Sequence, residues 1–215
     1  GALPLSLGMV ASPLLLLAGA TLALALSFDF ALVLALYLAV TTLYTFVLKR
    51  LAIVDVVSLA ALYSLRIFAG GQLADVPVSD WLIAFSMFFF LSLALVKRAA
   101  ELLVSRDAST TTLHGRGYAV DDLPVVTQLG VGAGHLSVLV FAVYIQSDTV
   151  RELYRHPWAL WFVCPLIFLW LARVWLLVGR GLMHDDPVVF AVRDRSSYAI
   201  GLVAAAVALV AGRFP

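Results

Sequence analysis

The stretch WLIAFSMFFFLSLALVKRAAE, residues 81–101, joins a long apolar run to a basic pair and a glutamate. Its apolar part approaches the roughly 20 residues that a helix needs to cross a bilayer. The arrangement recurs along the chain, because Lys49-Arg50 ends an earlier apolar run and Arg180 follows a later one. This repetition predicts membrane-spanning helices whose cations gather on one side.

The composition favours the same class of protein. Of the 215 residues, 63% are hydrophobic and 13% are charged, about half the roughly 25% charged residues of soluble domains. The net charge of +1 gives no indication of a nucleic-acid partner. We therefore predict an all-α polytopic transmembrane bundle and a single membrane domain over residues 1–215. Its seven expected spans are residues 5–26, 31–48, 51–70, 80–97, 124–146, 157–178 and 197–212.

The distribution of cations predicts the orientation. Nine cations follow the second, fourth and sixth spans, and three lie on the other side: Lys49, Arg50, Lys97, Arg98, Arg106, Arg116, Arg180, Arg193 and Arg195 against Arg151, Arg155 and Arg213. Short loops that are rich in Lys and Arg face the cytoplasm. We expect a multi-pass membrane protein with its N-terminus and basic loops in the cytoplasm.

Two ionisable residues, Asp55 and Arg66, lie within the third predicted span. Such groups are costly in a membrane and usually face the interior of a bundle. They share a helix face but lie about 16 Å apart along the axis, too far to pair. Asp55 either takes part in binding a cation or metal-bridged phosphate, or pairs with a neighbouring helix. Arg66 either completes a polar network or pairs with a neighbouring helix.

The basic pairs are candidate phosphate ligands. Lys49 and Arg50 close a segment that begins at Tyr44, and Lys97-Arg98 is followed by Glu101. Lys97 and Glu101 share a face if the helix continues past residue 97. Arginine binds phosphate in bidentate fashion and lysine adds a point charge, so two such ends meeting on one side would hold a diphosphate. Each pair alone is also explained as an orientation signal.

The two longer loops, 98–123 and 179–196, carry most of the remaining polar residues. Glycines flank Arg116 just before Tyr118 and allow close backbone approach to a ligand, although they also occur in plain turns. Asp186 precedes Pro187 and is expected to cap a short helix rather than to bind a metal. The triplet Arg193-Asp194-Arg195 predicts an ion-pair cluster that ties its loop to the bundle.

Other catalytic chemistries find no support in the sequence. It contains no P-loop, no G-x-S-x-G motif and no dinucleotide-binding fingerprint. His135 and His156 lack partners at metal-ligand spacing, and Cys164 is the single cysteine. These observations leave membrane-embedded chemistry or transport as the functions to consider.

Over essentially its whole length, the chain is similar to the C-terminal part of the UbiA superfamily of intramembrane prenyltransferases. It most resembles the branch of the decaprenyl-phosphate phosphoribosyltransferases. Four stretches carry the resemblance: YTFVLKRLAIVD (44–55), YSLRIFAG (63–70), ALVKRAAEL (94–102) and DPVVFAVRDRSSYAIG (186–201).

The resemblance implies a nine-helix bundle around a cavity open to lipid, with Mg²⁺ bound to the diphosphate of the donor. The family's first aspartate-rich motif is absent, so we expect that the chain begins just beyond it at Gly1 to Pro4. The main metal site and two helices would then lie in a missing N-terminal segment, and this fragment alone would be inactive. At the second motif the usual aspartates are replaced by Lys97-Arg98 and Glu101, as in the phosphoribosyl branch.

The implied reaction transfers phosphoribose from phosphoribosyl diphosphate to a polyprenyl phosphate. Two alternatives remain: prenyl transfer from a polyprenyl diphosphate to a small acceptor, and an anion transporter or structural membrane subunit. The resemblance assigns catalytic positioning to Asp55 and Glu101. Substrate binding would fall to Tyr44, Lys49, Arg66, Lys97, Arg98, Arg116 and Tyr118.

Overall fold

The computed structural model describes residues 5–108, 111–113, 115–183 and 186–212. The predictions about Gly1 to Pro4 and Arg213 concern residues outside these ranges. The helices are α1 (Leu5–Leu26), α2 (Phe28–Phe46), α3 (Val54–Ala74), α4 (Asp80–Asp107), α5 (Leu123–Ile145), α6 (Asp148–Leu153), α7 (Val163–Gly179), α8 (Pro187–Arg193) and α9 (Arg195–Ala211), with 3-10 turns η1 (Leu48–Arg50), η2 (Val120–Asp122) and η3 (Pro157–Phe162).

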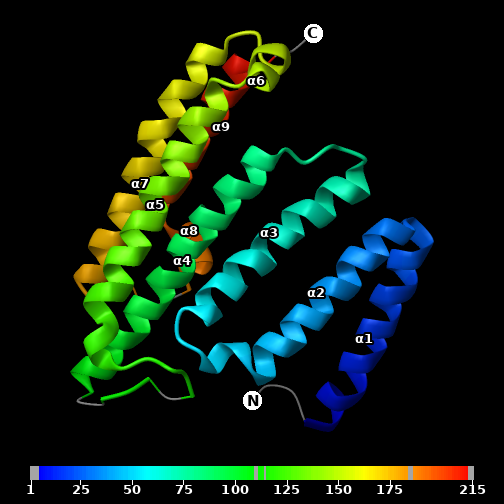
Figure 1. Ribbon diagram of the computed structural model, residues 1–215, viewed down its shortest axis with the longest axis vertical. Helices are drawn as coiled ribbons and strands as arrows, with labels where there is room; N and C mark the ends of the chain where they lie inside the picture. The colour runs from blue at the N-terminus through cyan, green and yellow to red at the C-terminus, as the bar shows by residue number, and fades with distance from the viewer. Residues whose placement is uncertain (1–4, 109–110, 114, 184–185, 213–215) are drawn as a thin grey trace.

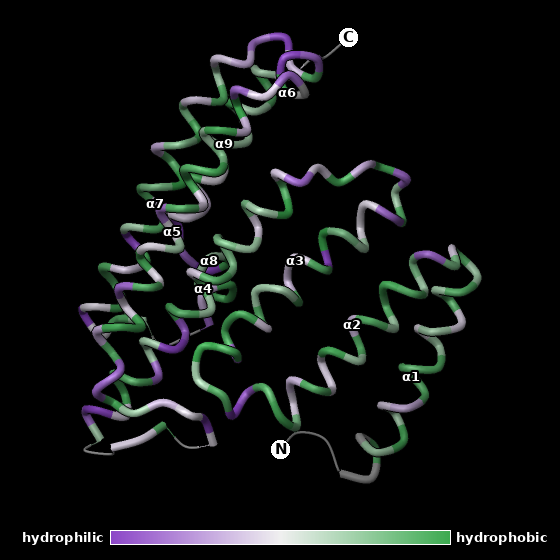
Figure 2. The backbone as a smooth tube through the Cα atoms, viewed as in Figure 1, coloured by the Kyte–Doolittle hydropathy of each residue, from purple (hydrophilic) through white to green (hydrophobic). Residues whose placement is uncertain are grey.

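The described part of the chain confirms the prediction of an all-α polytopic bundle. Six helical segments are long and apolar enough to cross a membrane: α1, α2, α3, α4, η2 with α5, and η3 with α7. A seventh span exists if α8 and α9, which meet at a bend of 82°, are taken together. The polar residues gather at the ends of these helices and in the turns between them (Figure 2).

Consecutive helices lie side by side, and α4 is at the centre of the arrangement (Figure 1). It contacts α3 and α5 over long stretches and also touches α7 and α8. Val96, Ala99 and Leu102 of α4 are completely buried and pack in one core with Val126 of α5 and Val174 of α7. Helix α4 is therefore the element against which the others are positioned.

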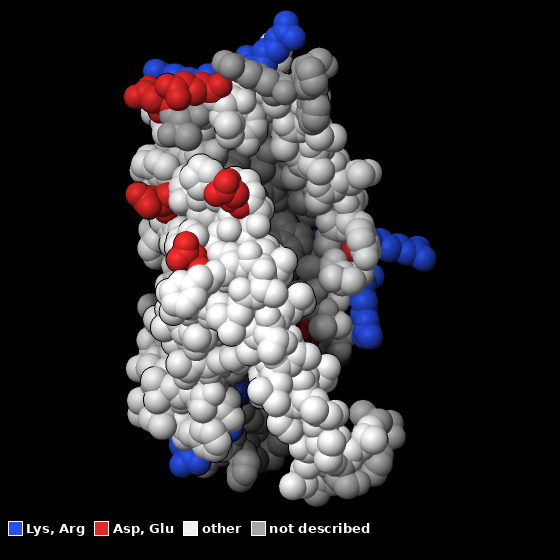
Figure 3. All heavy atoms as spheres, turned by 90° about the vertical axis from the view of Figure 1, so that its right-hand side faces the viewer, with Lys and Arg blue, Asp and Glu red and all other residues white. Residues whose placement is uncertain are grey.

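The hairpin of α1 and α2 forms one edge of the bundle (Figure 1). Helix α2 has no buried residue, and leucines such as Leu15 of α1 are largely exposed. The face on this side is mostly uncharged, with a few acidic side chains in its upper half (Figure 3). Lipid chains solvate such a surface as well as an apolar core does, so these exposed leucines fit a membrane protein.

The fourth predicted span was too short. We expected a loop from residue 98, but α4 continues to Asp107. The added residues AAELLVSRD include strong helix formers, and Ala99 and Leu102 are buried against neighbouring helices. The helix therefore continues beyond the apolar run, and it places Lys97 and Glu101 on one face, one turn apart.

Two local predictions about the last loop are confirmed. Asp186 caps α8 by accepting a hydrogen bond from the backbone N–H of Val188, and Pro187 is the first helical residue. At the bend into α9, Asp194 accepts two hydrogen bonds from the Arg173 guanidinium, at 2.6 and 2.9 Å. This ion pair ties the bend to α7, as the charge triplet had indicated.

Candidate functional site

A buried group of charged side chains joins α3 to α4. Arg98 and Asp55 both have 0% side-chain exposure, and Nη2 of Arg98 lies 2.8 Å from Oδ2 of Asp55. The other terminal nitrogen of Arg98 forms an ion pair with Glu101, three residues further along α4. A buried charge is costly unless it is paired, and Asp55 and Glu101 are the two partners of the Arg98 guanidinium.

Arg116, from the loop between α4 and α5, is the second cation of this group. Its guanidinium lies 3.5 Å from Asp55 and 3.8 Å from Glu101, and it donates a hydrogen bond of 3.2 Å to the Tyr44 hydroxyl. Burial by itself lowers the pKa of Arg116, but Tyr44 and the two carboxylates outweigh burial and raise it. The charged group therefore contains two arginines and two carboxylates, whose formal charges cancel.

Tyr118 fastens the same loop to the charged group. Its side chain is buried, and its hydroxyl donates to Oδ1 of Asp55 at 2.6 Å while it accepts from the backbone N–H of Ile53 at 2.8 Å. Burial and the hydrogen bond to Asp55 raise the pKa of Tyr118, so the hydroxyl keeps its proton and remains a donor. The Arg98 guanidinium lies over the Tyr118 ring, 5.4 Å from its centre.

The backbone next to this group is strained at one residue. Ile53 has a φ of 67°, in the left-handed region that is costly for a β-branched residue. Its N–H is the one that Tyr118 accepts. The hydroxyl therefore helps hold a turn that brings Asp55, two residues later, into the first turn of α3.

The glycine before Tyr118 serves the protein's own packing. A Cβ on Gly117 would lie 2.6 Å from the carbonyl oxygen of Arg50, so only glycine permits this contact between the loop and η1. The sequence left two alternatives for these glycines, the approach of a ligand or a plain turn. At Gly117 the close neighbour is the Arg50 backbone instead.

Removing the Tyr118 hydroxyl tests this connection. In Tyr118→Phe, Asp55 loses a donor and the Ile53 N–H loses its acceptor, so we expect a loss of about 1.5–3 kcal/mol in the free energy of unfolding. Unfolding in mixed micelles measures it. Tyr198→Phe is the matched control, because Tyr198 is 59% exposed. Equal stability of the two variants would contradict a fastening role for Tyr118.

Lys97 lies beside this group and faces a pocket. Its Nζ is 2.8 Å from Oδ2 of Asp186. Burial raises the pKa of Asp186, but the hydrogen bonds from Lys97 and the Val188 backbone outweigh burial, and the net pKa is lowered. We call the hollow here the polar pocket. Its volume is about 360 Å³, and its lining includes Lys97, Glu101, Val104, Ser105, Met183 and Asp186.

Two further hollows continue from the polar pocket along α4. A small one of about 60 Å³, the neck, is lined by Tyr63, Phe90, Lys97, Asp186 and Val188, among others. Beyond it a strongly apolar one of about 380 Å³, the apolar groove, lies between α4, α7, α8 and α9. Its lining includes Phe90, Leu93, Trp170, Pro187, Ile200 and Gly201. The three hollows share lining residues, so they follow one path from charged to apolar surroundings.

The structure brings six of the predicted site residues into the charged group: Tyr44, Asp55, Arg98, Glu101, Arg116 and Tyr118. Lys97 joins them through the pocket that it shares with Glu101. Arg66 lies elsewhere, exposed, with Nε 3.1 Å from the Tyr37 hydroxyl of α2. Lys49 lies half-buried in η1 and lines none of the three hollows described above.

The sequence did not indicate that Asp186 lines the polar pocket, or that an apolar groove lies beyond this pocket. A usable signal for the path was the spacing of Phe90, Leu93, Lys97, Glu101 and Val104, which follows one helix face by steps of three and four. No sequence pattern indicated that Asp186, 89 positions after Lys97, would lie against it.

The described residues do not fit a magnesium site of their own. No group of three or more His, Cys, Asp or Glu side chains comes together in the part of the chain that the structure describes. Asp55 is already bonded to Arg98 and Tyr118, and Glu101 to Arg98. Mg²⁺ stays a prediction, and no step below is routed through it.

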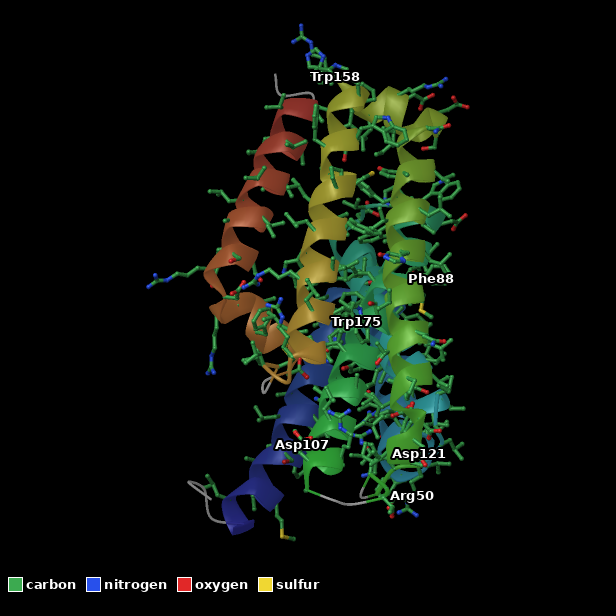
Figure 4. All side chains as sticks on the ribbon, turned by 90° about the vertical axis from the view of Figure 1, so that its left-hand side faces the viewer. Arg50, Phe88, Asp107, Asp121, Trp158 and Trp175 are labelled. Carbon is green, nitrogen blue, oxygen red and sulfur yellow. The ribbon has the colours of Figure 1, made fainter. Side chains whose placement is uncertain are left out.

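The charged ends of the bundle can be followed in Figure 4, where Arg50, Asp107 and Asp121 lie at one end and Trp158 lies at the other. The fold and this geometry define an integral membrane protein that has a charged pocket next to an apolar groove.

Comparison with known proteins narrows the class. No protein-family model matches the chain. It is 39% identical over 206 residues to an uncharacterized protein, y4nM, of Sinorhizobium fredii, covering 95% of this chain and 40% of that protein. It is 33% identical over 175 residues to the nodulation protein NoeC of Azorhizobium caulinodans, covering 79% and 57%. It is 29% identical over 168 residues to the decaprenyl-phosphate phosphoribosyltransferase of Mycobacterium tuberculosis, covering 78% and 53%.

The chain therefore spans about half the length of these relatives. The similarities support a distant relationship to UbiA-like prenyltransferases.

Proposed function

We propose that this chain forms part of a membrane transferase that moves phosphoribose from phosphoribosyl diphosphate to a polyprenyl phosphate. The observation that carries the proposal is the path along α4, on which a lysine-bearing pocket leads through a neck to an apolar groove. A polyprenyl phosphate has the same order of parts, with an anionic head and a long apolar tail. The name of the mycobacterial relative points to the same acceptor and group.

The acceptor's head fits the polar pocket. Lys97 is the cation among the described residues of its lining, and its ammonium group can contact the phosphate as a point charge. The isoprenoid tail would follow the apolar groove, where Phe90 and Trp170 provide apolar surface. The tail enters from the bilayer, whose chains are as apolar as the groove, so its transfer supplies little net hydrophobic energy. The groove would set the direction of the tail, and Lys97 would fix the reacting end.

The donor would lie at the side of the pocket next to the charged group. Arg116 keeps 23% of its side chain exposed and Glu101 keeps 32%, so both can meet a ligand. The guanidinium of Arg116 suits the diphosphate, and the Glu101 carboxylate can accept hydrogen bonds from sugar hydroxyls. Arg98 and Asp55 are completely buried, so they would act as positioning residues that hold Glu101 and Arg116 in place.

In the proposed step, a phosphate oxygen of the lipid forms a bond to the anomeric carbon of the sugar. The bond from this carbon to the diphosphate oxygen breaks, and the diphosphate leaves with the electron pair. Lys97 orients the attacking phosphate, and the cations of the site stabilise the negative charge that grows on the leaving group. The lipid phosphate is already an anion, so no side chain has to remove a proton.

The proposed orientation puts this site at the cytoplasmic surface of a bacterial inner membrane. The excess of basic residues at the connections α2–α3, α4–α5 and α7–α8 supports it. Phosphoribosyl diphosphate is a charged, water-soluble metabolite, so its pocket has to open to the aqueous compartment in which it is made.

The proposal is tested by incubating membranes that contain the protein with polyprenyl phosphate and phosphoribosyl diphosphate labelled in the sugar. We expect label in an organic-extractable lipid. Donor labelled in its diphosphate is the control and should leave the lipid unlabelled. Prenylation of a small aromatic acceptor from polyprenyl diphosphate, with no labelled lipid, would favour the alternative transferase. Anion flux into proteoliposomes without any product would favour a transporter.

A further inference from the structure

Asp186 lies where the phosphate of the proposed acceptor has to bind. Its Oδ2 is 2.8 Å from Nζ of Lys97, the cation that the acceptor's phosphate would contact. Lys97 and Asp186 are also the two residues that line both the polar pocket and the neck. The ion pair therefore stands at the junction between the charged and the apolar parts of the path.

The junction is narrow in this state. The neck holds about 60 Å³, whereas the polar pocket holds about 360 Å³ and the apolar groove about 380 Å³. A lipid whose head lies in the polar pocket and whose tail lies in the groove has to pass the Lys97–Asp186 contact. Binding of such a ligand therefore requires that the pair separates.

Asp186 is mechanically connected to the groove. Its second carboxylate oxygen, Oδ1, accepts the N–H of Val188 at 3.0 Å and so caps α8. Pro187 and Val188, in the first turn of α8, line both the neck and the groove. A shift of Asp186 away from Lys97 therefore moves the residues that form the wall of the neck.

We propose that Asp186 is a latch that holds Lys97 and closes the neck until the phosphate of a single-tailed lipid phosphate monoester displaces its carboxylate. This inference rests on the proposed function, because it concerns the same site. A phosphate monoester carries about 1.5 to 2 negative charges near neutral pH against one for a carboxylate, so Lys97 favours the ligand. The narrow neck admits one chain, which selects against two-chain membrane phospholipids.

Substitutions of Asp186 can distinguish a latch from a residue that binds the ligand or only caps α8. In Asp186→Asn the side-chain oxygen still caps α8, but the negative charge that competes for Lys97 is gone. We expect farnesyl phosphate to bind about tenfold more tightly to this variant than to the wild type in lipid nanodiscs. Farnesol, which lacks the phosphate, should bind equally to both. Asp186→Ser keeps a capping oxygen and should behave like Asp186→Asn.

If Asp186 is a latch on Lys97, the gain in affinity for farnesyl phosphate must depend on Lys97. In a Lys97→Met background, Asp186→Asn should give no gain in affinity for farnesyl phosphate. Asp148→Asn removes a carboxylate from α6, whose exposed partner is Arg151 at 3.5 Å, and serves as the control for net charge. It should leave the affinity unchanged.

The two proposals fail in different ways. If the wild type binds neither farnesyl phosphate nor a longer polyprenyl phosphate, the proposed function fails and the latch with it. If the wild type binds them, and Asp186→Asn and Asp186→Ser leave the affinity equal or weaken it while both variants unfold like the wild type, the latch alone is refuted.

Discussion

Replacing Lys97 by methionine is expected to lower the rate of phosphoribosyl transfer by about 100-fold or more, with the fold intact. The apolar stem of methionine fills the same space, but the charge that orients the acceptor phosphate is lost. Loss of one preorganised electrostatic contact typically costs about 10²–10³ in rate. Initial rates of label incorporation into lipid, at saturating acceptor, measure the effect.

Two variants sharpen this prediction. Lys97→Arg keeps a positive charge and should recover part of the rate, because the guanidinium presents its donors in a different geometry. Lys49→Met is the matched control, since the chain has one other lysine and it lines none of the three hollows along α4. A large loss at Lys49 together with none at Lys97 would contradict the assignment and move the phosphate site toward η1.

Replacing Arg98 by methionine is expected to destabilise the protein by about 3–5 kcal/mol, the range found when one partner of a buried ion pair is removed. Asp55 would remain buried at 0% exposure with Arg116, 3.5 Å away, as its remaining cation. The variant should unfold at a lower denaturant concentration in mixed micelles.

Arg106→Met supplies the control on the same helix. Arg106 and its partner Asp107 are 56% and 77% exposed, and such surface pairs contribute about 0–1 kcal/mol. Asp55→Asn should resemble Arg98→Met, because it removes the other half of the same pair. If Arg98→Met and Arg106→Met unfold at the same denaturant concentration, the buried pair of Arg98 and Asp55 stabilises the bundle no more than the exposed pair does.

The interior charges show why the sequence predicted the site only in part. The sequence singled out Asp55 because it lies within a predicted span, and Arg98 because it belongs to a basic pair at the end of one. It could not say that they bind each other, since α3 and α4 meet only after folding. Both alternatives considered for Arg66 depended on the same missing information, and its partner is Tyr37 of α2.

The end of α4 shows why hydropathy alone misplaced a helix boundary. Hydropathy ends the span at Lys97, because charged residues interrupt the apolar run there. The helix nevertheless continues for ten residues, since Ala99 and Leu102 are buried in the core and the charges of Arg98 and Glu101 are neutralised by ion pairs. Hydropathy measures the preference of a residue for lipid, whereas the helix boundary also depends on the partners that folding supplies.

The sequence by itself determined the class of this protein: helices that span a membrane, because a bilayer leaves long apolar runs no other way to satisfy their backbone. It also determined the cap at Asp186, because this capping hydrogen bond joins residues two positions apart. Only the tertiary structure decided which charges pair and where a ligand fits. Arg98 meets Asp55, and Lys97 meets Asp186, across long stretches of chain. Contacts of that kind depend on how whole helices pack, and no local pattern contains that information.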